Sequence, residues 1–243
     1  MIPFSDPSEP DRVFPYVNIG LIVVNFIVFF YELSLAATSS NTLNAFFYHY
    51  SIVPCEYTNR CAIVPGTPHP FPITLVTSMF MHAGWLHILG SMIYLWVFGD
   101  NVENSMGHLR YLVFYLVCGL GANALEIATN VNGYAPGLGA SGAIAGVLAA
   151  YLMLYPSSRV RTLIPIAIIF FPVRLPAWVL IGFWFALQVF DGIVSLSNTA
   201  AGGVAYWAHV GGFITGAILI WVFRQPDRVG SMRAYHAGGS DGN

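Results

Sequence analysis

The residue with the clearest chemical potential is Ser141, which stands in the stretch GLGASGAIAG at residues 137–146, where a long apolar segment begins. A second polar residue, His209, stands in another apolar segment, within AHVGG. A serine hydroxyl beside an imidazole is an activated nucleophile, because the imidazole accepts the hydroxyl proton during attack. Ser141 and His209 would together support acyl transfer.

Acyl transfer also needs hydrogen-bond donors for the oxyanion. The backbone N–H groups of Ala140 and Ser141, near a predicted helix start, could supply them, and His87 is a second source. His82 is expected to be structural, joining a loop to a helix end. His82 and His87 lie five residues apart, roughly 140° around a helix, which argues against a shared metal site. We expect no cofactor and no metal.

Each of these residues also has a simpler explanation. In a chain with 24 glycines, Ser141 could be a small residue that lets two helices approach. His209 could be a polar residue that bridges helices. The catalytic interpretation depends on finding several such residues at one place.

The composition places these residues in a membrane protein. The chain has 243 residues, of which 56% are hydrophobic and only 8% charged, whereas a soluble domain has roughly 25% charged residues. The net charge is −2, all nine basic residues are arginine, and no basic run suggests nucleic acid. The acidic, proline-rich start is unlike a cleaved signal peptide, so the first apolar run is expected to be a retained helix.

We predict an all-α polytopic membrane protein with six transmembrane helices, since about 20 apolar residues span a bilayer. The predicted spans are residues 16–37, 82–100, 108–129, 140–155, 176–195 and 204–223. They form a membrane domain over residues 16–224, between an N-terminal segment (1–15) and a disordered tail (225–243). Residues 38–72 form a long loop, and the proline-broken segment 162–173 is a hairpin or an interfacial segment.

The arginines predict the orientation, because they concentrate on the cytoplasmic side of membrane proteins. With both termini cytoplasmic, only Arg60 lies outside. The arginines then inside are Arg12, Arg110, Arg159, Arg161, Arg174, Arg224, Arg228 and Arg233. The loop 38–72 is then external, where Cys55 and Cys61 could form a disulfide or remain two free thiols.

This topology brings the candidate residues to one depth. Ser141, His209, His82 and His87 come from three different predicted helices, and all fall just below the external surface. Small residues at a spacing of four let membrane helices approach closely. Two such pairs follow the candidates: Gly142 with Gly146, and Gly212 with Gly216. His209 shares a helical face with the second pair, so the fourth and sixth helices would bring His209 to Ser141.

These residues, taken together, resemble the rhomboid family of intramembrane serine proteases, of bacterial type. Gly139-Ala140-Ser141-Gly142 is similar to the family's Gly-x-Ser-Gly motif, and Ala208-His209-Val210-Gly211-Gly212 to its Ala-His-x-x-Gly motif. His82 and His87 resemble the paired histidines of its second helix. The segment from Val97 to Gly119 resembles the family's link between its second and third helices, where Glu103 and Arg110 would brace the cytoplasmic side.

The resemblance implies a mechanism and partners. Ser141 would be the nucleophile, His209 the base in a dyad without an acidic third member, and His87 an oxyanion donor. The substrates would be transmembrane segments of other membrane proteins, cleaved near the external face, with the fifth helix gating their lateral access. Membrane lipids are the other expected partner. The expected location is the cell (inner) membrane, as a multi-pass protein.

Two positions depart from the family pattern. Ser91 stands where the family usually has an oxyanion-donating Asn, and Ala145 where some members have a Tyr that stacks on the catalytic His. An aromatic residue such as Tyr206 or Trp207 would then have to position His209. The weakened oxyanion site leaves an alternative open, a rhomboid-like protein that binds membrane helices without cleaving them. A proton-conducting transporter is disfavoured, because the candidate residues cluster toward one face and no repeat is visible.

Overall fold

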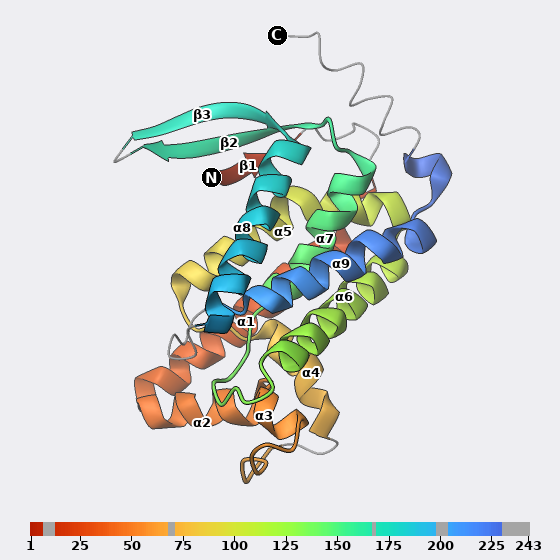
Figure 1. Cartoon of the computed structure of the whole chain (residues 1–243). Coiled ribbons are helices and arrows are strands. Elements are labelled where there is room, and N and C mark those ends of the chain that lie inside the picture. Colours follow the sequence, from red (N-terminus) through yellow and green to blue (C-terminus); the bar gives the residue numbers. More distant parts are fainter. Residues whose placement is uncertain (7–12, 68–70, 167–168, 198–203, 230–243) are drawn as a thin grey trace.

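The computed structural model describes residues 1–6, 13–67, 71–166, 169–197 and 204–229, and it is a bundle of helices with a small sheet at one end (Figure 1). The long helices are α1 (Tyr16–Thr38), α5 (Trp85–Met106), α6 (His108–Thr129), α7 (Ser141–Leu154), α8 (Ala177–Ser197) and α9 (Tyr206–Phe223). The shorter ones are α2 (Ser40–Tyr50), α3 (Pro54–Tyr57), α4 (Thr74–Thr77) and the 3₁₀ turns η1 (Phe71–Ile73) and η2 (Ser78–Phe80). The strands are β1 (Ile2–Ser5), β2 (Arg159–Ile166) and β3 (Ile169–Pro176).

Four described helices are long and apolar enough to cross a membrane: α1, α6, α8 and α9. A fifth span is possible if the segment Phe71–Phe80 and α5 are counted as one, although they meet at 82°. The remaining predicted span corresponds to α7, which has only 14 residues. The chain is thus a polytopic membrane protein with four to five candidate spans, and the count of six stays a prediction.

Helix α7 lies in the middle of the bundle, between α5, α6 and α9 (Figure 1). Most of its residues are buried, including Ala143, Ala145, Ala149 and Ala150. Its contact with α9 is so close that a Cβ placed on Gly212 would overlap the carbonyl oxygen of Gly142. The small residues therefore allow two backbones to touch, which is how membrane helices pack most tightly.

The three strands form an antiparallel sheet in the order β1-β2-β3, so the expectation of an all-α fold is wrong in this detail. In the hairpin β2–β3, Arg161 pairs with Arg174 and Ile164 with Phe171. Strand β1 adds to the free edge of β2, because an extended chain end can satisfy the unpaired N–H and C=O groups there. The segment 162–173 is thus a hairpin, and it lies at the same end of the bundle as the N-terminus (Figure 1).

The long loop is largely structured and lies at the other end of the bundle (Figure 1). It contains α2 and α3, and a disulfide joins Cys55 to Cys61. Ile52 pairs with Gly137, which ties the loop to the chain just before α7.

The start of the predicted C-terminal tail is also ordered. The Gln225 N–H donates to the carbonyl of Ser105 at 2.8 Å, and Val229 is buried. The remainder of the tail, 230–243, lies outside the described residues.

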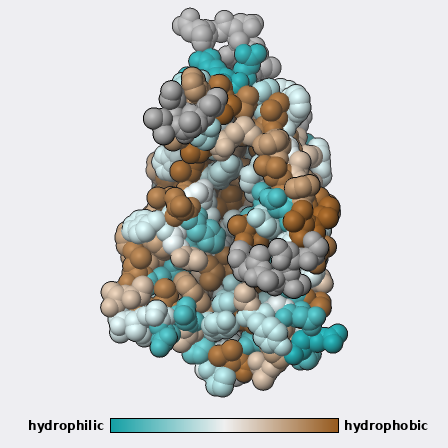
Figure 2. All heavy atoms as spheres, turned by 60° about the vertical axis from the view of Figure 1, so that its left-hand side comes forward, coloured by the Kyte–Doolittle hydropathy of each residue, from teal (hydrophilic) through white to brown (hydrophobic). Residues whose placement is uncertain are grey.

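The surface has the character of a membrane protein. Large apolar side chains are exposed on the outer faces of the long helices, among them Phe30, Trp96, Leu109, Phe190 and Trp221. Figure 2 shows hydrophobic residues spread over the flank of one face of the molecule. Apolar surface of this extent on long helices is typical of a face that contacts lipid.

Candidate active site

The structure brings Ser141 and His209 together. Ser141 is the first residue of α7, and His209 lies in the first turn of α9. The Nε2 atom of His209 is 2.8 Å from the Oγ atom of Ser141, which is a hydrogen bond. This contact follows from the close packing of α7 on α9, because His209 lies on the same face of α9 as Gly212 and Gly216.

His87 borders the same site from α5. Gly139 has a φ of 134°, in a region that favours glycine, and a Cβ placed there would lie 2.8 Å from Nε2 of His87 and 3.5 Å from Oγ of Ser141. The imidazole of His87 and the hydroxyl of Ser141 therefore face the same short stretch of backbone. Ala140 is fully buried beside them, and α7 begins at Ser141, so the first N–H groups of α7 lack intrahelical partners.

A cavity of about 880 Å³ opens in front of these groups. Ser91, one helical turn after His87, lines it together with Ser141 and His209. Tyr94 from α5 and Trp184 from α8 also line it, with their ring centroids 6.5 Å apart. The cavity is thus bounded on one side by two helices that also face lipid.

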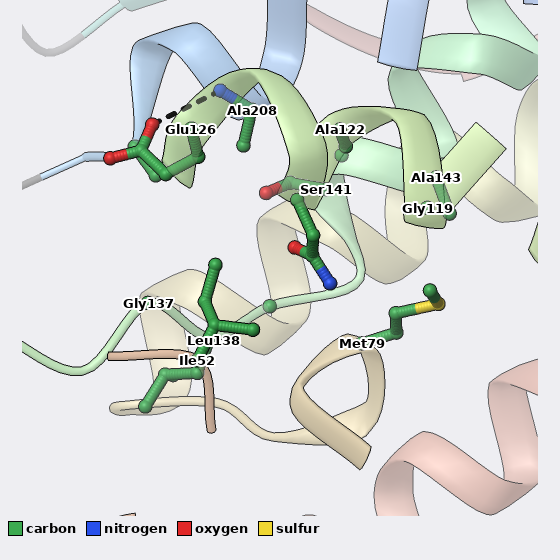
Figure 3. Close-up of a pocket in the computed structure, with 14 residues that line it drawn as sticks. Ile52, Met79, Gly119, Ala122, Glu126, Gly137, Leu138, Ser141, Ala143 and Ala208 are labelled. Carbon is green, nitrogen blue, oxygen red and sulfur yellow. Dashed lines mark hydrogen bonds between the residues drawn. The ribbon is translucent and has the colours of Figure 1, made fainter. Parts of the chain in front are cut away.

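A second, much smaller cavity also has Ser141 in its lining. It measures about 20 Å³ and is lined by Met79, Asn123, Glu126 and Leu138 among others (Figure 3). A cavity of this size has room for about one water molecule. The carboxylate of Glu126 accepts the N–H of Ala208 at 3.2 Å and so fixes the start of α9 next to His209 (Figure 3).

His82 lies behind His87 and does not face the cavity. Its ring is buried and meets the ring of His87 edge-on, with the centroids 5.0 Å apart. Its backbone N–H donates to the buried carboxylate of Glu32 on α1 at 3.1 Å. Glu32 and His82 therefore hold the bend before α5.

Glu103 and Arg110 contact helix ends far from the nucleophile. Glu103 accepts the N–H groups of Val17 and Asn18 at 3.0 and 2.7 Å, which caps the start of α1, and it also contacts His108. Arg110 donates to the carbonyl of Phe223 at the end of α9, at 3.5 Å. Within the described residues, no group of three His, Cys, Asp or Glu side chains could hold a metal ion.

Two residues of α8 near His209 escaped the sequence analysis. The Oε1 atom of Gln188 is 2.6 Å from Nδ1 of His209, and the ring centroid of Trp184 is 5.6 Å from that of His209. The aromatic ring beside His209 is thus that of Trp184. Trp207, one of the two aromatic residues suggested for this place, donates its indole N–H to the carbonyl of Gly192 at 3.1 Å. A single glutamine in an apolar helix has no spacing pattern that points to this role.

Comparison with known proteins places the sequence in one family. A model of the rhomboid domain matches residues 72–226. The chain is 31% identical over 161 residues to Rhomboid-like protein 11, chloroplastic, of Arabidopsis thaliana, which covers 63% of this chain and 54% of that protein. It is 33% identical over 168 residues to the mitochondrial Presenilin-associated rhomboid-like protein of Mus musculus, covering 63% and 40%. It is 26% identical over 159 residues to Rhomboid protein 1, mitochondrial, of Saccharomyces cerevisiae, covering 61% and 41%.

The chain belongs to the rhomboid family, and the resemblance drawn from its motifs is confirmed. It spans about half or less of the length of these relatives. The expected location in a bacterial-type cell membrane is wrong, because these relatives are named as chloroplastic and mitochondrial.

Proposed function

We propose that this protein is an intramembrane serine endopeptidase that cleaves transmembrane segments of other membrane proteins. The observation that carries the proposal is the 2.8 Å hydrogen bond between Nε2 of His209 and Oγ of Ser141 at the edge of a cavity. A hydroxyl in this arrangement can lose its proton to the imidazole as it attacks a carbonyl carbon.

The proposed reaction has two halves. In the first, Oγ of Ser141 bonds to the scissile carbonyl carbon while its proton passes to Nε2 of His209. The C–N bond then breaks, the amine leaves with that proton, and an acyl ester remains on Ser141. In the second half, His209 takes a proton from water, the hydroxide oxygen bonds to the ester carbon, and the proton returns to Oγ as the acid product leaves.

The oxyanion of each tetrahedral intermediate needs donors that are already in place. We assign this role to the ring of His87, the hydroxyl of Ser91 and the N–H groups at the start of α7 beside Ala140. The ring of His87 lies close to Gly139, which also faces Ser141. Ser91 lines the same cavity as Ser141. A serine side chain is shorter than that of asparagine. We therefore expect this oxyanion site to stabilise the intermediate less than a site with the family's usual Asn.

The cavity supports a membrane-embedded substrate. It is lined by Tyr94 and Trp184, which lie on two helices that also have exposed apolar side chains. A transmembrane segment could therefore approach between α5 and α8 without leaving the bilayer. Because these relatives are named as chloroplastic and mitochondrial, we place the protein in an organellar membrane. The apolar runs and the distribution of arginines support six spans with both termini on one side.

The proposal is tested with purified protein in detergent, a fluorophosphonate probe and a model transmembrane substrate. Wild type is expected to be labelled at Ser141 and to cleave the substrate, whereas Ser141→Ala and His209→Ala abolish cleavage. Each variant is checked for an unchanged thermal unfolding temperature. Substrate binding without cleavage or labelling of wild type would instead favour a rhomboid-like binding protein.

A further inference from the structure

Gln188 is a buried amide on an otherwise apolar helix, and it faces the histidine of the candidate site. Its exposed fraction is 8% and that of His209 is 7%. Its Oε1 atom lies 2.6 Å from Nδ1 of His209, and its Nε2 atom donates to the carbonyl of Trp184 at 3.4 Å. Both ends of the amide therefore have a partner, as the high cost of an unsatisfied polar group in a membrane requires.

These two contacts fix the orientation of the amide. The carbonyl of Trp184 can only accept a hydrogen bond, so the group that faces it must be the NH₂ of Gln188. The atom that faces His209 is then the amide oxygen, which also can only accept. Nδ1 of His209 must therefore carry a proton.

The protonation of Nδ1 determines the chemistry at the other ring nitrogen. In a neutral imidazole only one nitrogen carries a proton, and the partner of the first nitrogen decides which. With Nδ1 protonated, Nε2 has a free lone pair directed at Oγ of Ser141, 2.8 Å away. This is the tautomer that a general base needs. The opposite tautomer would place a second proton donor against the hydroxyl.

The surroundings of Gln188 hold it in this place. Trp184, one helical turn earlier, lies beside the ring of His209, and Phe185 stacks on Phe213 of α9 with ring centroids 4.0 Å apart. Among the described residues, the hydrogen-bond partners of the His209 ring are Gln188 and Ser141. A neutral amide on α8 thus stands where other serine hydrolases place a carboxylate.

We propose that Gln188 is a positioning residue that holds His209 in the Nδ1–H tautomer and aims its Nε2 atom at Ser141. This inference rests on the proposed function. During the reaction the Ser141 proton moves to Nε2 and on to the leaving amine, while the Nδ1–H bond to Gln188 stays intact and strengthens as the ring becomes charged. Gln188 itself exchanges no proton.

The first test compares variants that keep or remove the acceptor. Gln188→Met preserves the length of the side chain without an acceptor, and Gln188→Glu keeps an oxygen that accepts from Nδ1–H. We expect Gln188→Met to lower kcat by about 10- to 100-fold, as the loss of a hydrogen bond to a charged group implies, with little change in KM. Gln188→Glu is expected to keep far more activity than Gln188→Met. Ser195→Ala, which removes a local hydroxyl on the same helix, is the control and leaves kcat unchanged.

A role in packing alone would give the reverse order, because Met fits an apolar helix contact and a carboxylate does not. A Met variant as active as wild type, or more active than the Glu variant, therefore overturns the inference. If the Met variant fails to fold, the Glu variant and the spectroscopic measurement on wild type still decide the question.

The second test measures the tautomer itself. In protein labelled with ¹⁵N-histidine, the His209 signals are identified by their absence in His209→Gln. Wild type is expected to show a protonated Nδ1 and an unprotonated Nε2, and Gln188→Met a mixture of tautomers. A wild-type protein with the proton on Nε2 overturns the inference. This measurement needs no turnover, so a failure of the proposed function, seen as no cleavage and no labelling of Ser141, is distinguishable from a failure of the role of Gln188.

Discussion

At the scale of single residues, Ser91 is the position where a substitution should improve the proposed activity. Its side chain is buried one helical turn after His87 and lines the cavity that Ser141 and His209 also line. An asparagine there would reach further toward the oxyanion, and one such donor is worth about 10²–10³ in kcat. We expect Ser91→Asn to raise kcat by up to that factor and Ser91→Ala to lower it. Equal rates for all three proteins in a substrate-cleavage assay would show that position 91 contributes nothing to the oxyanion.

Gly139 is a second residue whose substitution has a predictable effect. Its φ of 134° strains any other residue, and a Cβ there would lie 2.8 Å from Nε2 of His87. We expect Gly139→Ala to lower kcat at least tenfold, because it displaces His87 and the backbone before Ser141. Gly20→Ala, where a Cβ has open space, is the matched control for cleavage and thermal unfolding. A fully active Gly139→Ala protein would remove His87 from the proposed oxyanion site.

Some residues of the candidate site could be predicted from the sequence and others could not. The pairing of Ser141 with His209 could be predicted, because glycines at a spacing of four mark the faces on which α7 and α9 meet. Gln188 could not, because α8 is apolar on all sides and its sequence does not show which face turns toward α9. The same ambiguity concealed Trp184, so the sequence analysis could suggest only Tyr206 or Trp207 as the aromatic residue beside His209.

At the scale of elements, the contact between α7 and α9 determines whether the candidate site exists. A methyl group on Gly212 would overlap the backbone of Gly142, so the two helices would have to separate. Overpacking of this kind costs roughly 1–3 kcal/mol. We expect Gly212→Ala to lower both the unfolding temperature and fluorophosphonate labelling of Ser141. Gly182→Ala on α8, which meets no neighbouring atom, should change neither, and equal labelling of the two variants would contradict the prediction.

The elements themselves were predicted unevenly. Long apolar runs identified the positions of α1, α6, α8 and α9, because a run of about 20 apolar residues has the length of a helix that crosses a bilayer. Strand β1 was missed, since four residues near a chain end have no pattern of their own until β2 offers an edge. The helices of the long loop were also missed, because Ser40–Tyr50 is too polar to resemble a span and too short for a reliable amphipathic signal.

At the scale of the whole molecule, the distribution of arginines makes the orientation testable. The hairpin with Arg159, Arg161 and Arg174 lies at the end of the bundle opposite α2 and α3, near which Arg60 is found (Figure 1). We expect epitopes fused before Met1 and after residue 243 to be accessible from the same side of sealed vesicles. An epitope inserted between Ala62 and Ile63 should be accessible only from the other side. Detection of the inserted epitope on the same side as the N-terminus would exclude six spans with this orientation.

The shortness of α7 has a consequence for which peptide bond the proposed protease would cut. Fourteen residues extend about 21 Å, whereas the hydrocarbon layer is about 30 Å thick. With the far end of α7 at the hairpin side of the bilayer, Ser141 lies roughly 9 Å inside the opposite boundary, a distance of about six residues of a substrate helix. The proposed protease would then select the cleavage point in its substrate by the distance of that point from the lipid boundary. When residues are inserted into a substrate between that boundary and the original cleavage site, the cut should move toward the boundary by the number of residues inserted.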